Sequence, residues 1–119
     1  MNDLATPMMN LLEKFLDVTS QRHKLVTANM ANIDTPGYRT KDLDFRGELQ
    51  RAVSDGNANF LPVARSVPGL LERPDGNNVS LDREGLLLAE VQMQFGLGIQ
   101  LLHHEFQNLL MAINEGSKA

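Results

Sequence analysis

Apolar residues recur every three or four positions between residues 8 and 33, which is the spacing of one face of an α-helix. They fall on two adjacent stripes, so this face is wider than the seam of a simple two-stranded coiled coil. The first stripe consists of Met9, Leu12, Leu16, Thr19, His23, Val26, Met30 and Ile33. The Asp34-Thr35-Pro36-Gly37 sequence predicts the helix end, because the residue before proline avoids the helical region and Pro-Gly favours a tight turn.

A second helical pattern covers residues 80–115. Ser80 is a suitable N-cap, Asp82 and Glu84 complement the positive end of the helix dipole, and Gly116 favours a stop. Its apolar stripe consists of Leu81, Leu88, Phe95, Ile99, Leu102, Phe106, Leu109 and Ile113. Both predicted helices are longer than the average helix of a globular protein.

The second helix is short of ionised residues. Between Val91 and Asn114 the only formally charged residue is Glu105. The positions away from the apolar stripe hold amides and histidines: Gln92, Gln94, His103, His104, Gln100, Gln107 and Asn108. An exposed helix normally carries a charged face, and Gly96 and Gly98 would allow another backbone to come close. Because one other long helix cannot cover most sides of this one, we expect neighbouring molecules to cover it.

The middle segment, residues 34–79, has no sustained periodicity. Turn-forming sequences interrupt it, a turn of helix is allowed at residues 45–53, and residues 60–63 and 66–67 could form two short strands of a hairpin. A long irregular segment is unusual in a compact domain, so we expect this one to become ordered on a partner. The predicted fold is one mainly α-helical subunit over residues 1–119. It has two long terminal helices, and its irregular middle can hold a short β-hairpin.

Composition excludes several classes of function. The 119 residues carry a net charge of −4 without a Lys/Arg cluster, so we expect no nucleic-acid partner. The absence of cysteine excludes disulfides, thiolate metal sites and a cysteine nucleophile. No motif for phosphate binding or nucleophilic catalysis is present, so we expect no enzymatic activity, no cofactor and no small-molecule substrate. The adjacent residues His103 and His104 point in different directions on a helix, so we expect no metal site.

Targeting signals are also missing from the sequence. The first residues lack a basic stretch followed by an apolar run, so we expect no cleaved signal peptide. No uninterrupted apolar run is long enough to span a bilayer.

The end of the first helix carries an unusual set of residues. Asn29 and Asn32 lie on a largely apolar stripe, where a buried amide needs a hydrogen-bond partner and can fix the register of an interface. Thr35, Pro36 and Gly37 then turn the chain, and Tyr38 supplies a ring with a hydroxyl group. These six residues are the candidate assembly motif. The alternative is a helix end whose asparagines bond within the monomer.

This segment resembles the Asn-x-x-Asn-x-x-Thr-Pro-Gly-Tyr signature of the bacterial flagellar rod and hook axial proteins. The resemblance extends over nearly the whole chain, and the short length favours a proximal rod subunit over members with large inserted domains. It implies that the long terminal helices pair as an antiparallel-type coiled coil. It also implies a structural subunit of the basal body rod, which crosses the periplasm, transmits torque and encloses the export channel. The implied partners are copies of itself, other rod subunits, the export gate and a rod adapter protein at the membrane ring. Export would proceed through the flagellar type III apparatus.

Two alternatives remain at this point. Another short rod subunit would resemble a Ser-Arg-x-Tyr-x-x-Asn pattern in the last helix, where this chain has residues 94–100 without those side chains. A cytoplasmic helical adaptor or export chaperone would also suit an amide-rich helix. In either case we expect the helix–helix packing to use Leu12, Leu16, Val26, Phe95, Leu102, Phe106, Leu109 and Ile113.

Overall fold

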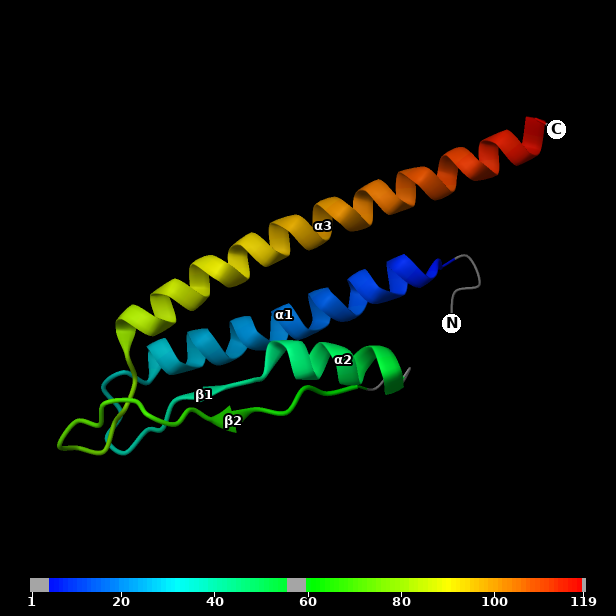
Figure 1. Ribbon diagram of the computed structural model, residues 1–119. Coiled ribbons are helices and arrows are strands. Elements are labelled where there is room, and N and C mark those ends of the chain that lie inside the picture. The colour runs from blue at the N-terminus through cyan, green and yellow to red at the C-terminus, as the bar shows by residue number, and fades with distance from the viewer. Residues whose placement is uncertain (1–4, 56–59, 119) are drawn as a thin grey trace.

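The molecule is an elongated helical hairpin with a short third helix along one side (Figure 1). A computed structural model describes residues 5–55 and 60–118, and the protein measures 71 × 26 × 18 Å along its principal axes. The elements in chain order are α1 (Pro7–Ala31), β1 (Lys41–Asp42), α2 (Phe45–Asp55), β2 (Arg65–Ser66) and α3 (Leu81–Lys118).

Local sequence explains both ends of α1. Thr6 caps the helix by accepting a hydrogen bond from the Met9 backbone amide at 3.0 Å, and Pro7 occupies the first helical turn. The helix ends at Ala31, two residues before the predicted end. The amide of Ile33 already bonds to the carbonyl of Met30, three residues back, so the ladder tightens and stops before Pro36.

The predicted antiparallel pairing of α1 with α3 is confirmed. The end of α1 meets the start of α3 where Asn29 bonds to Glu84, and the start of α1 meets α3 where Thr6 bonds to Glu105. The buried apolar residues of the two helices are branched aliphatic side chains: Leu12, Val18, Val26, Leu87 and Val91. Such a core suits two helices whose axes lie close together.

At Gly98, α3 packs closely against side chains of α1. A Cβ atom at this position would lie 2.8 Å from Leu16 Cδ2 and 3.1 Å from Phe15 Cδ1. Gly96, in contrast, has nothing within 4 Å of its Cβ position in the described part of the chain. Of these two glycines, only Gly98 is therefore required by packing within the subunit.

We expect Gly98→Leu to lower the free energy of unfolding by about 2 kcal/mol or more, because the added side chain overpacks the α1–α3 interface. Gly96→Leu is the matched control, and it is expected to stabilise the subunit by roughly 0.5–1 kcal/mol through its higher helix propensity. Urea unfolding followed by circular dichroism compares the two variants. Equal effects at both positions would contradict the assigned contact.

The middle segment is more ordered than the sequence predicted. It contains α2, which packs on α1 through an edge-to-face contact between Phe15 and Phe45 with ring centroids 5.5 Å apart. Leu43 and Val79 are buried within the subunit. The expectation that this segment needs a partner to become ordered is therefore wrong for the described residues.

The predicted short β element is present, but its strands were placed incorrectly. Residues 65–66 pair antiparallel with residues 41–42, which precede α2, with Lys41 opposite Ser66 and Asp42 opposite Arg65. Residues 60–63 form no strand. The sequence suggested a hairpin between two segments that follow each other closely in the chain. In the structure, the two strands that pair are separated by α2.

The last third of α3 extends past the rest of the subunit (Figure 1). Beyond the Thr6–Glu105 contact it continues through Gly116, the predicted stop, to Lys118. These 13 residues span about 20 Å. We call residues 106–118 the overhang.

By length and composition, α3 is apolar enough over residues 81–117 to cross a membrane, although polar side chains interrupt its apolar runs. In the structure, 17% of its most apolar stretch is buried. A helix that is covered by protein on most sides has the same composition.

Candidate functional site

Asn29 is the centre of the predicted assembly motif, and the structure places it inside the subunit with 1% of its surface exposed. Its amide nitrogen donates to the Lys41 carbonyl at 2.8 Å and to Glu84 Oε1 at 2.7 Å. Its amide oxygen accepts from the Tyr38 hydroxyl at 2.9 Å and from the Lys41 backbone amide at 3.2 Å. These four bonds use its hydrogen-bonding capacity, so Asn29 ties α1, the turn, β1 and α3 together.

Asn32 and Thr35 stabilise the turn itself. The Asn32 side chain donates to the Ala28 carbonyl at 2.8 Å and accepts from the Thr35 hydroxyl at 3.0 Å. The buried Asn77 side chain donates to the backbone carbonyls of both Asn32 and Thr35 at 2.9 Å. Residues 32–35 and 77 therefore form one connected turn.

Pro36 and Gly37 are exposed, and Gly37 adopts a positive φ of 74°, which suits a residue without a side chain. The Gly37 amide donates to the Asp75 carbonyl at 2.8 Å. All six motif residues thus lie at one end of the molecule, and the contacts described here join them to their own chain.

A network of ionised groups lies beside Asn29. Asp42 accepts two hydrogen bonds from Arg22, both at 3.1 Å, and one from Arg83 at 2.6 Å. Arg83 also donates to Glu84 at 2.7 Å. Glu84 is fully buried, so Asn29 and Arg83 replace the water that its carboxylate would otherwise need.

The environment of Asp42 lowers its pKa. Burial alone would raise the pKa, but hydrogen bonds from Arg22, the Leu43 backbone amide and Arg83, together with the charge of Arg22, outweigh burial. For Tyr38, burial and the nearby Glu84 charge raise the pKa, so its hydroxyl stays protonated and can donate to Asn29.

We expect the subunit to lose stability as pH falls below the usual pKa range of an aspartate. A carboxyl whose folded pKa is lowered contributes stability above its unfolded pKa and loses that stability as pH falls through the folded value. Asp42→Asn should therefore flatten the decline of the urea midpoint between about pH 5 and pH 3. An unchanged slope in this variant would contradict the assignment.

Sequence reasoning missed the partners of the motif, namely Asp42, Arg83 and Glu84. Glu84 was assigned to the first turn of the last helix because acids complement the helix dipole there. Its position one turn before Leu87 and Leu88, on the same side of the helix, could have indicated burial.

The predicted packing residues divide into two groups along α3. Leu12 and Val26 are buried, and Leu16, Phe95, Leu102 and Leu109 are half-buried. Phe106 and Ile113 are each 47% exposed. The predicted stripe is therefore used within the subunit only as far as α1 reaches.

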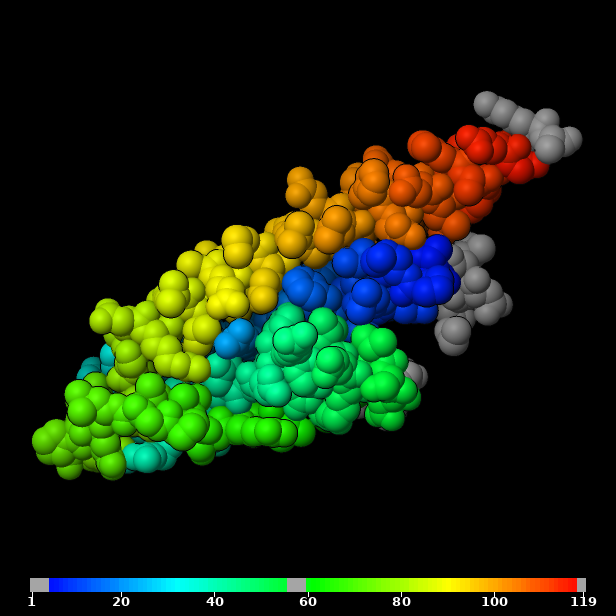
Figure 2. Space-filling view, viewed as in Figure 1, coloured from blue at the N-terminus to red at the C-terminus, as the bar shows by residue number. Residues whose placement is uncertain are grey.

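The distal half of α3 is rich in exposed apolar side chains. The space-filling view shows this part of the helix at the surface (Figure 2). From residue 106 to residue 117 every residue is exposed except Leu109, which is half-buried. Leu110, Met111 and Ile113 are each at least 45% exposed. Exposed apolar surface of this length is typical of a protein–protein interface.

The three histidines lie in different surroundings. His23 packs edge-to-face on Phe95 with ring centroids 6.2 Å apart, whereas His103 and His104 are exposed. Among residues 5–55 and 60–118 no group of three or more His, Cys, Asp or Glu side chains could hold a metal ion.

Known proteins resemble this chain along its whole length, although no family profile matches it. The flagellar basal body rod protein FlgB of Yersinia ruckeri is 26% identical over 98% of this chain and 100% of its own length. FlgB of Salmonella typhimurium is 27% identical over the same shares of both chains. FlgB of Borrelia hermsii is 28% identical over 88% of this chain and 94% of its own. With its paired terminal helices and its motif turn, the chain is therefore similar along nearly its whole length to the flagellar basal body rod proteins FlgB of distant bacteria.

Proposed function

We propose that this chain is a structural subunit of the proximal rod of the flagellar basal body and that its activity is assembly itself. The observation that carries the proposal is the distal half of α3, which is long, apolar, nearly free of ionised groups and uncovered by its own chain. Burying exposed apolar surface contributes about 25 cal/mol per Å². Helices of neighbouring subunits are the natural cover.

A protein assembly suits α3 better than a bilayer does. Gln92, Gln100, His103, Gln107 and Asn108 are exposed along the helix. In a bilayer each of these polar groups would lack water and would cost free energy unless it found a partner. Between protein helices, amides of neighbouring chains can pair with one another.

We propose that the motif residues serve assembly indirectly, by holding the subunit in one shape. Asn29, Asn32 and Tyr38 fix the angle at which the chain leaves α1, and they lock the start of α3 through Glu84. A rod that transmits torque needs rigid subunits. The shear is shared across many contacts, and a subunit that deformed would not pass its share on.

The family resemblance supports the finer parts of the proposal. These are a rod that crosses the periplasm and encloses the export channel, export without a cleaved signal, and contacts with other rod subunits, the export gate and the rod adapter protein. The relatives described above are all rod proteins, which favours a rod subunit over a cytoplasmic adaptor or export chaperone.

Deletion of the gene in its flagellated host tests this proposal. We expect the mutant to lack hooks and filaments and the wild-type gene to restore them, because distal structures need a complete rod beneath them. Electron microscopy of cells and isolated basal bodies provides the readout. Normal hooks in the mutant, or loss of only one other protein's stability, would contradict the rod function.

A further inference from the structure

Three acidic residues of α3 make polar contacts with α1 or with its N-cap. The contacts are Asn29 with Glu84 at 2.7 Å, Arg22 with Glu90 at 3.9 Å, and Thr6 with Glu105 at 3.1 Å. We call them the cross-helix pairs. No other Asp or Glu occurs between positions 84 and 114, so every carboxylate of this stretch contacts α1 or its cap.

The cross-helix pairs bracket the α1–α3 interface. Thr6 and Asn29 are 23 positions apart in the sequence, and Glu84 and Glu105 are 21 positions apart. At 1.5 Å per residue, these separations are about 34 Å and about 32 Å. The first and last pairs therefore lie at the two ends of one antiparallel contact. We call the Asn29–Glu84 end the base of the hairpin and the Thr6–Glu105 end the free end.

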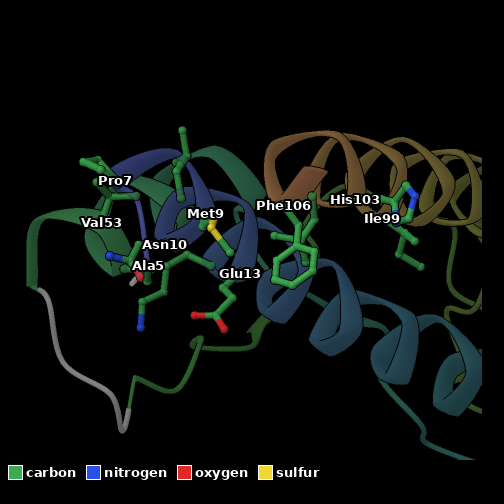
Figure 3. Close-up of a pocket in the computed structure, with 13 residues that line it drawn as sticks. Ala5, Pro7, Met9, Asn10, Glu13, Val53, Ile99, His103 and Phe106 are labelled. Carbon is green, nitrogen blue, oxygen red and sulfur yellow. The ribbon is translucent and has the colours of Figure 1, made fainter. Parts of the chain in front are cut away.

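Apolar packing becomes weaker towards the free end. Residues 7–11 of α1 include no buried residue, and from residue 92 to residue 117 of α3 the only buried residue is Gly98. A groove of about 990 Å³ opens at this end, between the start of α1, the end of α2 and α3 (Figure 3). A polar contact at the free end therefore carries a larger share of what holds the two helices together than one at the base does.

Glu105 meets the positive end of the α1 dipole. The Thr6 hydroxyl accepts from the Met9 backbone amide at 3.0 Å and donates to Glu105, so it links an amide of the first turn to the carboxylate. The first turn of α1 contains no acidic residue of its own. A negative charge at this end stabilises a helix. Glu105 therefore supplies from α3 the charge that the start of α1 lacks.

The burial of Glu105 agrees with this role. Its side chain is half-buried, whereas the two residues on each side of it in the sequence are exposed. It is also the only formally charged residue between Val91 and Asn114. Withdrawing a lone carboxylate from water costs free energy unless a donor replaces the water, and Thr6 is that donor.

We propose that Glu105 is the positioning residue that holds the first turns of α1 against α3. The other two cross-helix pairs hold the base and the middle of the hairpin, and Glu105 holds the free end. Because the overhang begins at the next residue, the Thr6–Glu105 contact also sets how much of α3 the chain leaves uncovered. This inference concerns the single subunit and does not depend on the proposed rod function.

Hydrogen–deuterium exchange of the purified full-length chain tests the proposal. Glu105→Ala removes both the acceptor and the charge. We expect the backbone amides of residues 10–14 to exchange about fivefold faster or more in this variant, because the free end opens without the base and loses its hydrogen bond to a charged group. Glu105→Gln keeps an oxygen that accepts from Thr6, so it should recover part of the protection.

Two control variants separate this effect from a general loss of stability. Glu115→Ala makes the same substitution in the overhang, beyond the reach of α1, and should leave exchange at residues 10–14 unchanged. Asp42→Asn weakens the base at neutral pH, so it should speed exchange there but not at residues 10–14, whose opening leaves the base intact.

Four results would overturn the proposal. The first is an unchanged exchange rate at residues 10–14 in Glu105→Ala, and the second is an equal rise in Glu105→Ala and Asp42→Asn. The third is exchange in Glu105→Gln as fast as in Glu105→Ala, because the acceptor would then not matter. The fourth is a wild-type chain whose residues 10–14 already exchange without protection, because no contact would then hold them.

Discussion

A chain carrying Phe106→Glu and Ile113→Glu is expected to fold like the wild type and to leave its host without hooks or filaments. Both side chains are half exposed and contribute little to the subunit core. In the assembly each would lose about 2 kcal/mol of apolar burial, and a buried carboxylate adds a further cost. A total of roughly 4 kcal/mol weakens each contact about a thousandfold. Motility assays and electron microscopy of complemented deletion strains measure the result.

The matched control introduces the same charges on a polar side of the same helix. Gln100→Glu with Gln107→Glu also adds two carboxylates to exposed positions of α3. We expect this variant to assemble hooks and filaments, because positions 100 and 107 lie about 100° or more around the helix from Phe106 and Ile113. If both variants assembled normally, the distal half of α3 would not be an interface. If both failed, added charge rather than the loss of apolar surface would explain the defect.

Arg83→Met is expected to cost the subunit about 3–5 kcal/mol of unfolding free energy, because it leaves the buried Glu84 carboxylate without its cation. Asp42 would keep Arg22 as a partner, so Glu84 bears most of the loss. Equilibrium unfolding in urea at neutral pH measures the change.

Arg39→Met is the control for this experiment. Arg39 pairs with Glu72 at 3.0 Å, but both side chains are more than half exposed, so its removal should cost under about 1 kcal/mol. Equal losses in the two variants would show that the buried network adds nothing beyond an ordinary surface ion pair. A second substitution, Glu84→Leu, should recover part of the stability of Arg83→Met, because it removes the unpaired charge.

Helical periodicity was enough to predict the long elements of this fold. The stripes through Leu12 and Val26 and through Phe95 and Leu102 gave two long amphipathic helices that must bury their apolar faces, and the family resemblance implied that these helices pair. The third helix, α2, was not predicted beyond a possible turn. It has 11 residues, contains Gly47 in its first turn and carries several charges, so its short pattern is weak.

The candidate site was predicted in position but not in its contacts. The need of Asn29 for hydrogen-bond partners follows from its place on an apolar stripe, but its partner Glu84 lies 55 residues away in sequence. Local spacing carries no information about which distant side chain meets it. The exposure of distal α3 was predictable, because a scarcity of charges over two dozen residues depends on composition alone.

The α1 end and its turn therefore stabilise the single subunit, and the other end of the molecule carries the exposed apolar surface. This separation explains why the motif residues find their hydrogen-bond partners within the chain, whereas the apolar side chains of distal α3 are left uncovered by it. One end fixes the shape of the subunit, and we propose that the other end joins it to its neighbours.

A cryo-electron microscopy map of the isolated basal body tests the central claim most directly. The measurement is the solvent exposure of α3 residues 99–117 in the assembled rod. We predict that Phe106, Leu110, Met111 and Ile113 are buried against helices of neighbouring chains. A rod in which these side chains face water, while the subunits join through other surfaces, would contradict the account.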